Sequence, residues 1–326
     1  MQERMEFLKA DLVHLFDDQG IDKSQYDHVV KFRDPITAYN NAKGYMFNIA
    51  LLKRVFSPKF FLHDIRQTGE HEATTRWTMV MDFTLLPQGS ALRKFWSPKL
   101  TFTGVSIMGV NPENGKFNRH IDYWDAIANQ EYFSLEALQH VLAQLASLSH
   151  APPGLETPPH MVLRKRKDYE VRRYEPFLVA EAALGGADPA GDGGDAFRTL
   201  AGYLFGENAA GERMAMTAPV ISSTSGVMQF FMGGGRQAAD VPAPTAGSVR
   251  VREMSGGLFA IAAFSGHADP PRARAEAEKL RAALARDGMA FAGDDWALLR
   301  YNDPGTWPPL RLNEVLVPLA GFDLWG

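Results

Sequence analysis

Hydrophobic positions near the start of the chain recur every three to four residues. The segment 7–16, FLKADLVHLF, carries this spacing, and the segment 36–56, ITAYNNAKGYMFNIALLKRVF, carries it over a longer stretch. A repeat close to 3.6 residues is typical of an amphipathic helix with one apolar face. The pattern therefore predicts two helices at the start of the chain.

The hydrophobic period then changes to alternation. Residues 60–85 alternate on both sides of a polar turn, and residues 99–127 alternate around the turn NPENGK. Alternation places successive side chains on opposite faces of a strand, so each segment is predicted to form an antiparallel pair. Helical spacing returns at 134–148 and predicts a closing helix. Helices followed by long antiparallel strands indicate an α+β cone, in which a curved sheet wraps on helices.

A proline-rich segment divides the chain. Residues 149–161, SHAPPGLETPPHM, contain four prolines, and proline interrupts both helices and central strands. We therefore predict an N-terminal domain at 1–148, a linker at 149–161 and a C-terminal domain at 162–326.

The C-terminal domain contains an internal repeat with an offset of 80 residues. The segments 171–183, VRRYEPFLVAEAA, and 251–263, VREMSGGLFAIAA, share six identical positions, and a segment with helical spacing follows each of them. Leu200 matches Leu280 in these helices at the same offset. The repeat predicts a duplicated strand–helix–strand unit, with two helices related by a pseudo-twofold axis.

Composition restricts the possible chemistry. The 326 residues carry a formal net charge of −4, with 45% hydrophobic and 22% charged residues, which is the balance of a soluble globular protein. The absence of cysteine excludes disulfides, thiolate catalysis and cysteine-ligated zinc or haem. Neither domain is basic, which argues against nucleic acid, and we interpret the one basic cluster, Arg164–Lys167, as a solvated strand entry. No apolar run is long enough to span a bilayer, and the common nucleotide, zinc-protease and serine-hydrolase motifs are absent.

The first helix predicted in the repeat, AFRTLAGYLF at 196–205, has an apolar stripe. Its members are Phe197, Leu200, Ala201, Leu204 and Phe205, spaced as one helix face. Such a stripe either packs on the sheet or, along one edge, lines a groove for a flat apolar ligand.

Two methionines follow this helix in the segment 212–220, ERMAMTAPV. Met214 and Met216 alternate with Ala215, which predicts that both lie on one side of a strand that ends near Pro219. Methionine can ligate haem iron or copper, but no histidine stands nearby, and methionine also serves as an adaptable apolar filler. We interpret the pair as core or groove lining and expect no metal ligand.

In order along the chain, these segments resemble the SOUL/haem-binding-protein family. The resemblance is carried by YEVRRYEPFLVAE, AFRTLAGYLFGEN with RMAMTAPV, QFFM, DPP and YNDPGTWPPLRLNEVLVPL, over about residues 160–326. It implies a distorted β-barrel flanked by two helices, with an apolar groove for haem or a related tetrapyrrole beside the first helix. Some animal members are proposed to use a histidine where this chain has Arg173. Past the linker only His267 remains, for which a loop or helix-capping role is expected, so binding without strong axial coordination is implied.

The resemblance implies a tetrapyrrole site built from the helix stripe, the two methionines and arginines at the rim. The porphyrin face is expected to lie on the apolar side chains, and the propionates to pair with arginines, each of which can equally be a solvated surface residue. The residues implied are Phe197, Leu200, Ala201, Leu204, Phe205, Met214, Met216, Arg172, Arg173, Arg198 and Arg213.

The first domain resembles a plant and algal family of unknown function with a SnoaL-like (nuclear-transport-factor-2-like) fold. The segments FRDPITAYNNAKGY, FFLHDIRQTG and TFTGVSIMGVN with GKFNRHIDYWDAI carry the resemblance, over about residues 5–145. Proteins of this cone shape sometimes isomerise, dehydrate or hydrolyse small apolar molecules. His120 and Asp122 alternate and face one side of their strand, and either His63 or Asp64 can join them. Such a pair acts as general base and orienter, or forms a buried hydrogen-bonded network that holds the sheet.

Together the two resemblances indicate a soluble two-domain protein that binds a tetrapyrrole for trafficking, buffering or delivery. The pairing resembles plastid proteins of plants and green algae, so a chloroplast location (stroma, plastoglobule or eyespot) is expected, with the transit peptide absent from this chain. Binding rather than catalysis is the main interpretation. Two others stay open: an enzyme acting on a pigment, terpenoid or lipid in the first domain's cone, and a scaffold in a plastid lipid particle or in a complex with a haem-metabolising enzyme.

Overall fold

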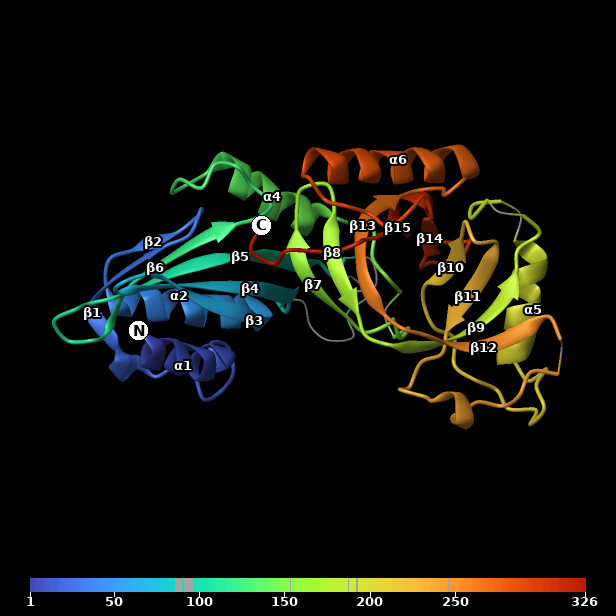
Figure 1. Cartoon of the computed structure of the whole chain (residues 1–326), viewed down its shortest axis with the longest axis horizontal. Helices are drawn as coiled ribbons and strands as arrows, with labels where there is room; N and C mark the ends of the chain where they lie inside the picture. Colours follow the sequence, from blue (N-terminus) through green and yellow to red (C-terminus); the bar gives the residue numbers. More distant parts are fainter. Residues whose placement is uncertain (86–89, 91–95, 153, 187, 192, 246) are drawn as a thin grey trace. The chain divides into compact units, whose positions relative to one another are not determined.

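The computed structural model describes residues 1–85, 90, 96–152, 154–186, 188–191, 193–245 and 247–326. Within these residues the chain forms two compact units (Figure 1). The first unit consists of Met1–Leu148, Val162–Lys167 and Leu324–Gly326, and the second of Ser149–Met161 and Asp168–Asp323. The two short segments of the first unit are those that the sequence pattern assigns to the C-terminal domain.

The first unit is a six-stranded sheet with helices packed on it, which confirms the predicted α+β cone. The strand order is β2-β1-β6-β5-β4-β3, and every neighbouring pair is antiparallel except the parallel pair β1 and β6. The two hairpins predicted from alternation are β3–β4 and β5–β6. The elements are α1 (Gln2–Asp11), η1 (Leu12–His14), η2 (Lys23–Gln25), β1 (Tyr26–Arg33), β2 (Ala38–Tyr39), α2 (Ala42–Val55), β3 (Phe56–Gly69), β4 (Glu72–Phe83), β5 (Lys99–Val110), β6 (Phe117–Trp124) and α4 (Leu135–Ala146).

The helix α2 begins later than the sequence pattern predicts. Its N-cap is Asn41, whose side chain accepts a hydrogen bond from the Gly44 N–H at 2.8 Å, the usual way in which asparagine starts a helix. The residues before the cap form β2, which pairs with β1. The cap therefore divides one apolar stretch into a short strand and a helix.

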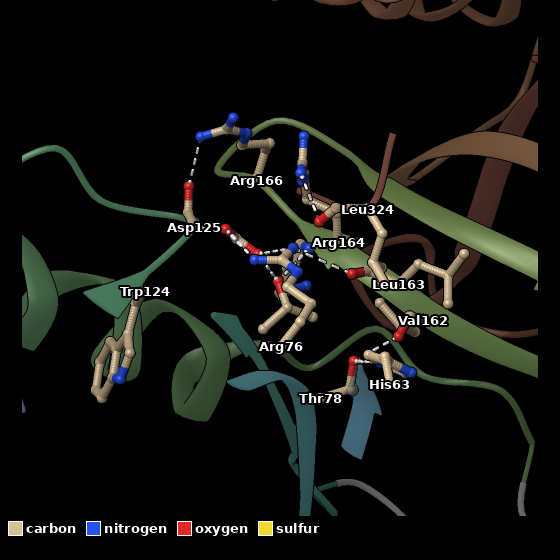
Figure 2. A network of polar contacts seen from close by, with 12 residues as sticks. His63, Arg76, Thr78, Trp124, Asp125, Val162, Leu163, Arg164, Arg166 and Leu324 are labelled. Atoms are coloured by element: carbon tan, nitrogen blue, oxygen red, sulfur yellow. Dashed lines mark hydrogen bonds and ion pairs between the residues drawn. The ribbon is translucent and has the colours of Figure 1, made fainter. Parts of the chain in front are cut away.

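A buried arginine holds a short segment of the first unit against its sheet (Figure 2). Arg76 on β4 is 2% exposed, and its guanidinium donates to the Asp125 carboxylate at 2.8 and 2.5 Å and to the carbonyl of Leu163 at 3.2 Å. A buried charge without a partner costs several kcal/mol. The carboxylate and the carbonyl therefore make this position of Arg76 possible.

The basic cluster Arg164–Lys167 is not the solvated strand entry that we predicted. Arg164 is 5% exposed and donates to the carbonyl of Leu324 at 3.3 Å. Arg166 donates to the backbone carbonyl of Asp125 at 3.0 Å (Figure 2). The two arginines thus donate to backbone carbonyls of other segments of the first unit, whereas composition predicts that water solvates them.

The second unit is built on strands β8 to β15 of a curled nine-stranded sheet, an open half-barrel, on which α5 and α6 pack (Figure 1). Residues 162–165 of the ninth strand, β7, fall in the first unit. The strand order is β12-β9-β11-β10-β14-β15-β13-β8-β7, and the neighbours from β12 to β8 are antiparallel. The elements are β7 (His160–Lys165), β8 (Glu170–Tyr174), β9 (Phe177–Ala183), α5 (Gly194–Leu204), β10 (Val220–Ser223), β11 (Val227–Phe231), η3 (Ala238–Asp240), β12 (Val249–Met254), β13 (Gly257–Ser265), α6 (Pro270–Arg286), β14 (Ala297–Arg300), η4 (Pro308–Leu310) and β15 (Leu312–Pro318).

The strand order confirms the predicted internal repeat. The run β12-β9-β11-β10 from one side corresponds strand by strand to β8-β13-β15-β14 from the other, and α5 corresponds to α6. The register repeats as well, because Val251 of β12 lies opposite Ala180 of β9, and Val171 of β8 lies opposite Ala260 of β13. The first strand of each repeat therefore pairs with the other half of the sheet.

Strand alternation gives the second sheet two faces with different surroundings. On β9, Leu178, Ala180 and Ala182 join Leu200 and Leu204 of α5 in one buried cluster. The residues between them along the strand point to the opposite face. Helices cover the first face, and the second face lines a cavity.

Candidate functional site

The predicted helix stripe is mostly core. Leu200 and Leu204 are 0% and 1% exposed, whereas Phe197 and Phe205 on the same helix face are 41% and 50% exposed. Ala201 is partly buried against the same cluster. Burial of a leucine side chain stabilises the fold by about 1.5–3 kcal/mol. A flat ligand therefore reaches the two phenylalanines directly, but reaches the two leucines only by opening the core.

The two methionines do not lie on a strand, so the predicted strand around them is wrong. β10 begins only at Val220, and the N–H of Met214 donates to the carbonyl of Leu204 at 2.8 Å, which ties this segment to the end of α5. Burial still alternates, since Met214 is buried, Ala215 is exposed and Met216 is partly buried. Both methionines pack against the apolar cluster beneath α5.

The predicted arginines do not form one rim. Arg198 on α5 and Arg213 after it are exposed, and Arg198 forms a surface ion pair with Asp195. Arg173 on β8 is also exposed. Arg172, its neighbour in sequence, points to the opposite face of β8 and is 9% exposed, so the rim position predicted for Arg172 is wrong.

The face of the second sheet that lies opposite α5 lines a cavity of about 400 Å³. This volume lies within the range of about 300–1,000 Å³ that is usual for pockets holding small molecules and cofactors. The walls are mostly apolar, and many of their side chains are aromatic. The large lining side chains are Tyr174, Phe177, Ile221, Phe259, Trp296, Leu299, Tyr301 and Leu316.

A buried charge network lies behind two tyrosines of this cavity. Arg172 donates to the Glu314 carboxylate at 2.7 and 3.0 Å, to Glu170 at 2.8 Å and to the Tyr174 hydroxyl at 3.4 Å, and Tyr301 donates to Glu314 at 2.6 Å. Burial alone lowers the pKa of Arg172, but the carboxylates of Glu314 and Glu170 raise it well above its usual value. The pair stays ionised, and the network satisfies both tyrosine hydroxyls, so the tyrosine rings present apolar surface to the cavity.

Polar groups interrupt the apolar walls in two places. In one, Gln229 donates to the Glu181 carboxylate at 3.0 Å, and Arg252 lies 3.7 Å from the same carboxylate with its side chain 56% exposed. In the other, His160 at the start of β7 lines the cavity and packs at a tilt against Tyr174, with 4.9 Å between ring centroids. The cavity thus combines a cation that can meet a carboxylate and a nitrogen donor within an apolar surface.

In the first unit, the structure brings the predicted pair His120 and Asp122 together. His120 Nε2 lies 2.8 Å from Asp122 Oδ1, its Nδ1 lies 2.9 Å from the Tyr45 hydroxyl, and Ser106 donates to the same Asp122 oxygen at 2.5 Å. A carboxylate accepts, so Nε2 is the donor to Asp122. Both ring nitrogens are bonded and His120 is 7% exposed, which is the arrangement of a structural network.

A small cavity of about 60 Å³ adjoins this pair. A buried water needs about 10–15 Å³, so the space suits a few waters rather than an apolar substrate. Asp34 also lines it. Burial raises the pKa of Asp34 to about 6 against hydrogen bonds from Thr37 and the Ile36 N–H, and the charge of Asp122 raises it further. A space of this volume suits water better than a larger reactant.

His63 does not join the His120–Asp122 pair. It sits at a bulge in β3, and its Nε2 lies 2.7 Å from the hydroxyl of Thr78. That hydroxyl donates to the carbonyl of Val162 at 2.6 Å, so it accepts from the histidine ring (Figure 2). His63 therefore belongs to the polar network drawn in Figure 2. Asp64 does not join the pair either, since its carboxylate accepts a hydrogen bond from the indole of Trp325 at 2.7 Å.

The cavity of the second unit is the site that sequence reasoning missed. Its residues on β9 and β11 alternate with those beneath α5, for example Phe177 and Glu181 with Leu178 and Ala182. This alternation is readable in the sequence, but it does not show which face becomes enclosed. His267, the histidine that we noted past the linker, lies in a loop before α6, whose N-cap is another residue.

Two broader features follow from the described residues. No helix among them is long and apolar enough to cross a bilayer. No three or more histidine, aspartate or glutamate side chains among them gather in the arrangement of a metal site.

Comparison with solved structures gives low similarity. TsrD from Streptomyces laurentii is 16% identical, with 45% of this chain and 95% of TsrD covered, at a TM-score of 0.31. A putative polyketide cyclase from Xanthomonas campestris is 12% identical, with 44% and 98% covered, at a TM-score of 0.32. An NTF2-like protein of unknown function from Exiguobacterium is 13% identical, with 32% and 80% covered, at a TM-score of 0.26. These scores are too low to carry an argument about this chain.

Comparison with protein families assigns both parts of the sequence, whereas comparison with curated proteins gave no match. Residues 2–120 match the family described as uncharacterized conserved protein (DUF2358). Residues 155–318, which include all the lining residues of the 400 Å³ cavity, match the family described as SOUL heme-binding protein. Because this second match spans just over half of the chain, the protein belongs to the SOUL heme-binding protein family.

Proposed function

We propose that the second unit binds a tetrapyrrole in the 400 Å³ cavity of its sheet, and that the protein serves in tetrapyrrole trafficking, buffering or delivery. Membership of a heme-binding family supports a tetrapyrrole ligand. The observation that carries the location is the aromatic lining of a pocket of suitable volume. Apolar contacts and hydrogen bonds are reversible, which suits uptake and release.

The chemistry of the lining residues fits a tetrapyrrole. Aromatic rings suit the flat apolar face of a porphyrin, and the exposed guanidinium of Arg252 suits a propionate. His160 offers a nitrogen donor of the kind that binds haem iron. Glu181 and Asp295 are lining groups that repel a carboxylate, and Glu181 lies 3.7 Å from Arg252. We therefore place the propionates on the solvent-exposed side of the Arg252 guanidinium, away from Glu181.

The outer face of α5 is the competing location. It exposes Phe197 and Phe205, but Leu200 and Leu204 are already packed in the core. A ligand on this face would lie on two phenylalanine rings with solvent on its other side. The cavity covers more of a ligand's apolar surface, and transfer of apolar area from water is worth about 25 cal/mol per Å².

The test is a titration of the purified protein with hemin and with metal-free protoporphyrin IX, followed by absorbance and by tryptophan fluorescence. Ile221→Trp fills the cavity from β10, and Phe205→Arg places a charge on the exposed face of α5. We expect Ile221→Trp to weaken binding of both porphyrins by at least about tenfold, which is about 1.4 kcal/mol. Phe205→Arg is the matched control and should bind as the unaltered protein does.

The opposite result would move the site. Loss of binding in Phe205→Arg with normal binding in Ile221→Trp assigns the ligand to α5 and refutes the cavity. Absence of saturable binding in the unaltered protein refutes tetrapyrrole binding by this chain. Circular dichroism and the urea midpoint of each variant show whether a loss of binding reflects a loss of fold.

A further inference from the structure

One histidine of the second unit has a fixed proton position. The Nδ1 atom of His160 lies 3.1 Å from the carbonyl oxygen of Pro158. A carbonyl only accepts hydrogen bonds, so Nδ1 is the donor and carries the proton. In the neutral ring the remaining lone pair therefore lies on Nε2. A backbone carbonyl holding Nδ1–H is the usual outer contact of a histidine that binds a metal through Nε2.

The ring of His160 is also held in orientation. It packs against Tyr174 in a tilted arrangement, with ring centroids 4.9 Å apart and an interplanar angle of 36°. The Tyr174 hydroxyl accepts a hydrogen bond from the buried Arg172 at 3.4 Å. Both rings line the same cavity. The contacts on two sides of the imidazole thus restrict its rotation, and a preoriented ligand loses less entropy on binding.

His160 is solvent-accessible at the start of β7 and also lines the cavity. A metal bond to Nε2 uses the lone pair that the neutral tautomer leaves on that atom.

The cavity has a second soft donor, but it is engaged. The Met254 sulfur accepts weak hydrogen bonds from Gln229 at 3.7 Å and from Arg252 at 3.4 Å. Among these nitrogen and sulfur atoms, His160 Nε2 has a lone pair that none of the described contacts uses. This arrangement favours a single protein ligand.

We infer that His160 binds, through Nε2, the iron of a metallated tetrapyrrole held in the cavity of the second unit. The inference rests on the proposed function, because the cavity must first take up the porphyrin. It changes the expected ligand preference. Apolar contacts alone give iron-bearing and metal-free porphyrins similar affinities, whereas a nitrogen ligand raises the affinity for the iron-bearing one. The inference also supplies an axial ligand from β7, the strand beside β8, whereas the family resemblance directs the search to Arg173 on β8.

The experiment compares four forms of the full chain, the unaltered protein, His160→Ala, His160→Gln and His267→Ala, each with hemin and with metal-free protoporphyrin IX. His267 is the matched control, because it lies in a loop of the same unit, where Arg311 donates to its Nδ1 at 3.1 Å. We expect the unaltered protein to give hemin the absorbance and electron paramagnetic resonance signature of one histidine ligand. His160→Ala should lose this signature and bind hemin at least about tenfold more weakly, the scale of losing a group that supports metal binding.

Two further readouts separate ligation from packing. Binding of metal-free protoporphyrin IX should remain within about threefold in His160→Ala, because a factor of three is well under 1 kcal/mol and the apolar walls are unchanged. Added imidazole should restore the histidine-type spectrum in His160→Ala. His160→Gln keeps a polar side chain and should lose the signature in the same way, which guards against a folding defect of the alanine variant.

The outcomes are distinct. An unchanged hemin spectrum in His160→Ala, with normal porphyrin binding, overturns the assignment of His160 and leaves the cavity as an apolar site. Equal weakening of both porphyrins without imidazole rescue gives His160 a packing role and also overturns it. Failure of the unaltered protein to bind either porphyrin removes the proposed function and this inference with it.

Discussion

Replacement of Glu314 by glutamine removes one charge from the buried network of the second unit and keeps the side-chain shape. Arg172 meets Glu314 through two hydrogen bonds of 2.7 and 3.0 Å, and the two side chains are 10% and 4% exposed. Removal of one partner of such a pair costs about 3–5 kcal/mol, since the other charge stays buried. Glu170 remains 2.8 Å from Arg172, so we expect the lower end, about 3 kcal/mol. This is a large share of the roughly 5–15 kcal/mol that stabilises a domain.

Urea unfolding measures this loss. With a urea slope of about 2 kcal/mol per M, a loss of about 3 kcal/mol lowers the midpoint by about 1.5 M. Asp195→Asn is the control, because its ion pair with Arg198 lies on the surface and should leave the midpoint unchanged. The double replacement Arg172→Met with Glu314→Leu should regain only part of the stability, since it removes the buried pair but also takes from Glu170 its 2.8 Å contact with Arg172. A Glu314→Gln midpoint equal to that of Asp195→Asn would refute the reasoning.

Two further predictions concern the first unit's acid and the repeat of the second. The Asp34 pKa is raised from 3.8 to about 6, so the folded protein binds this proton more tightly than the unfolded chain does. The protonated group therefore adds about 3 kcal/mol to the free energy of unfolding below about pH 4, and this stabilisation is lost as the pH rises through 6. Asp34→Asn should remove this fall in urea midpoint between pH 4.5 and 7, and parallel curves for the two proteins would contradict it. Leu200→Ala and Leu280→Ala occupy equivalent positions at 0% and 2% exposure and should each lower the free energy of unfolding by about 2–5 kcal/mol. A cost below about 1 kcal/mol for either variant in urea unfolding would show that its helix is not packed as described.

Local periodicity predicts much of the fold because it records which face of an element is buried. The hairpins β3–β4 and β5–β6 and the helices α4, α5 and α6 follow from spacing alone. The repeat was readable for a related reason. Equivalent strands occupy equivalent places in one sheet, so they keep similar residues at one offset, as Val171 and Val251 do in their pairings with Ala260 and Ala180.

Contacts between distant segments set the limits of such prediction. The strand β1 pairs in parallel with β6, and nothing near β1 in the sequence indicates a partner some 90 residues away. The inward position of Arg172 has the same origin. Composition assigns this arginine to the surface, but its ion pair with Glu314 of β15 allows it to be buried. The burial of a charge cannot be predicted before its partner is known.

The proline-rich segment 149–161 shows why a search for ligand residues cannot stop at apparent linkers. Prolines hold a chain extended and remove donors, but the other residues between them still bond. Here the backbone carbonyl of Glu156 accepts a hydrogen bond from the Ala218 N–H at 2.9 Å, and its carboxylate accepts from the Gly234 N–H at 2.7 and 2.9 Å. The segment is therefore part of the second unit, and it places His160 in the cavity wall. The segment that composition marks as a linker thus contributes the histidine of the cavity wall, whereas the apolar stripe of α5 contributes mainly to the hydrophobic core.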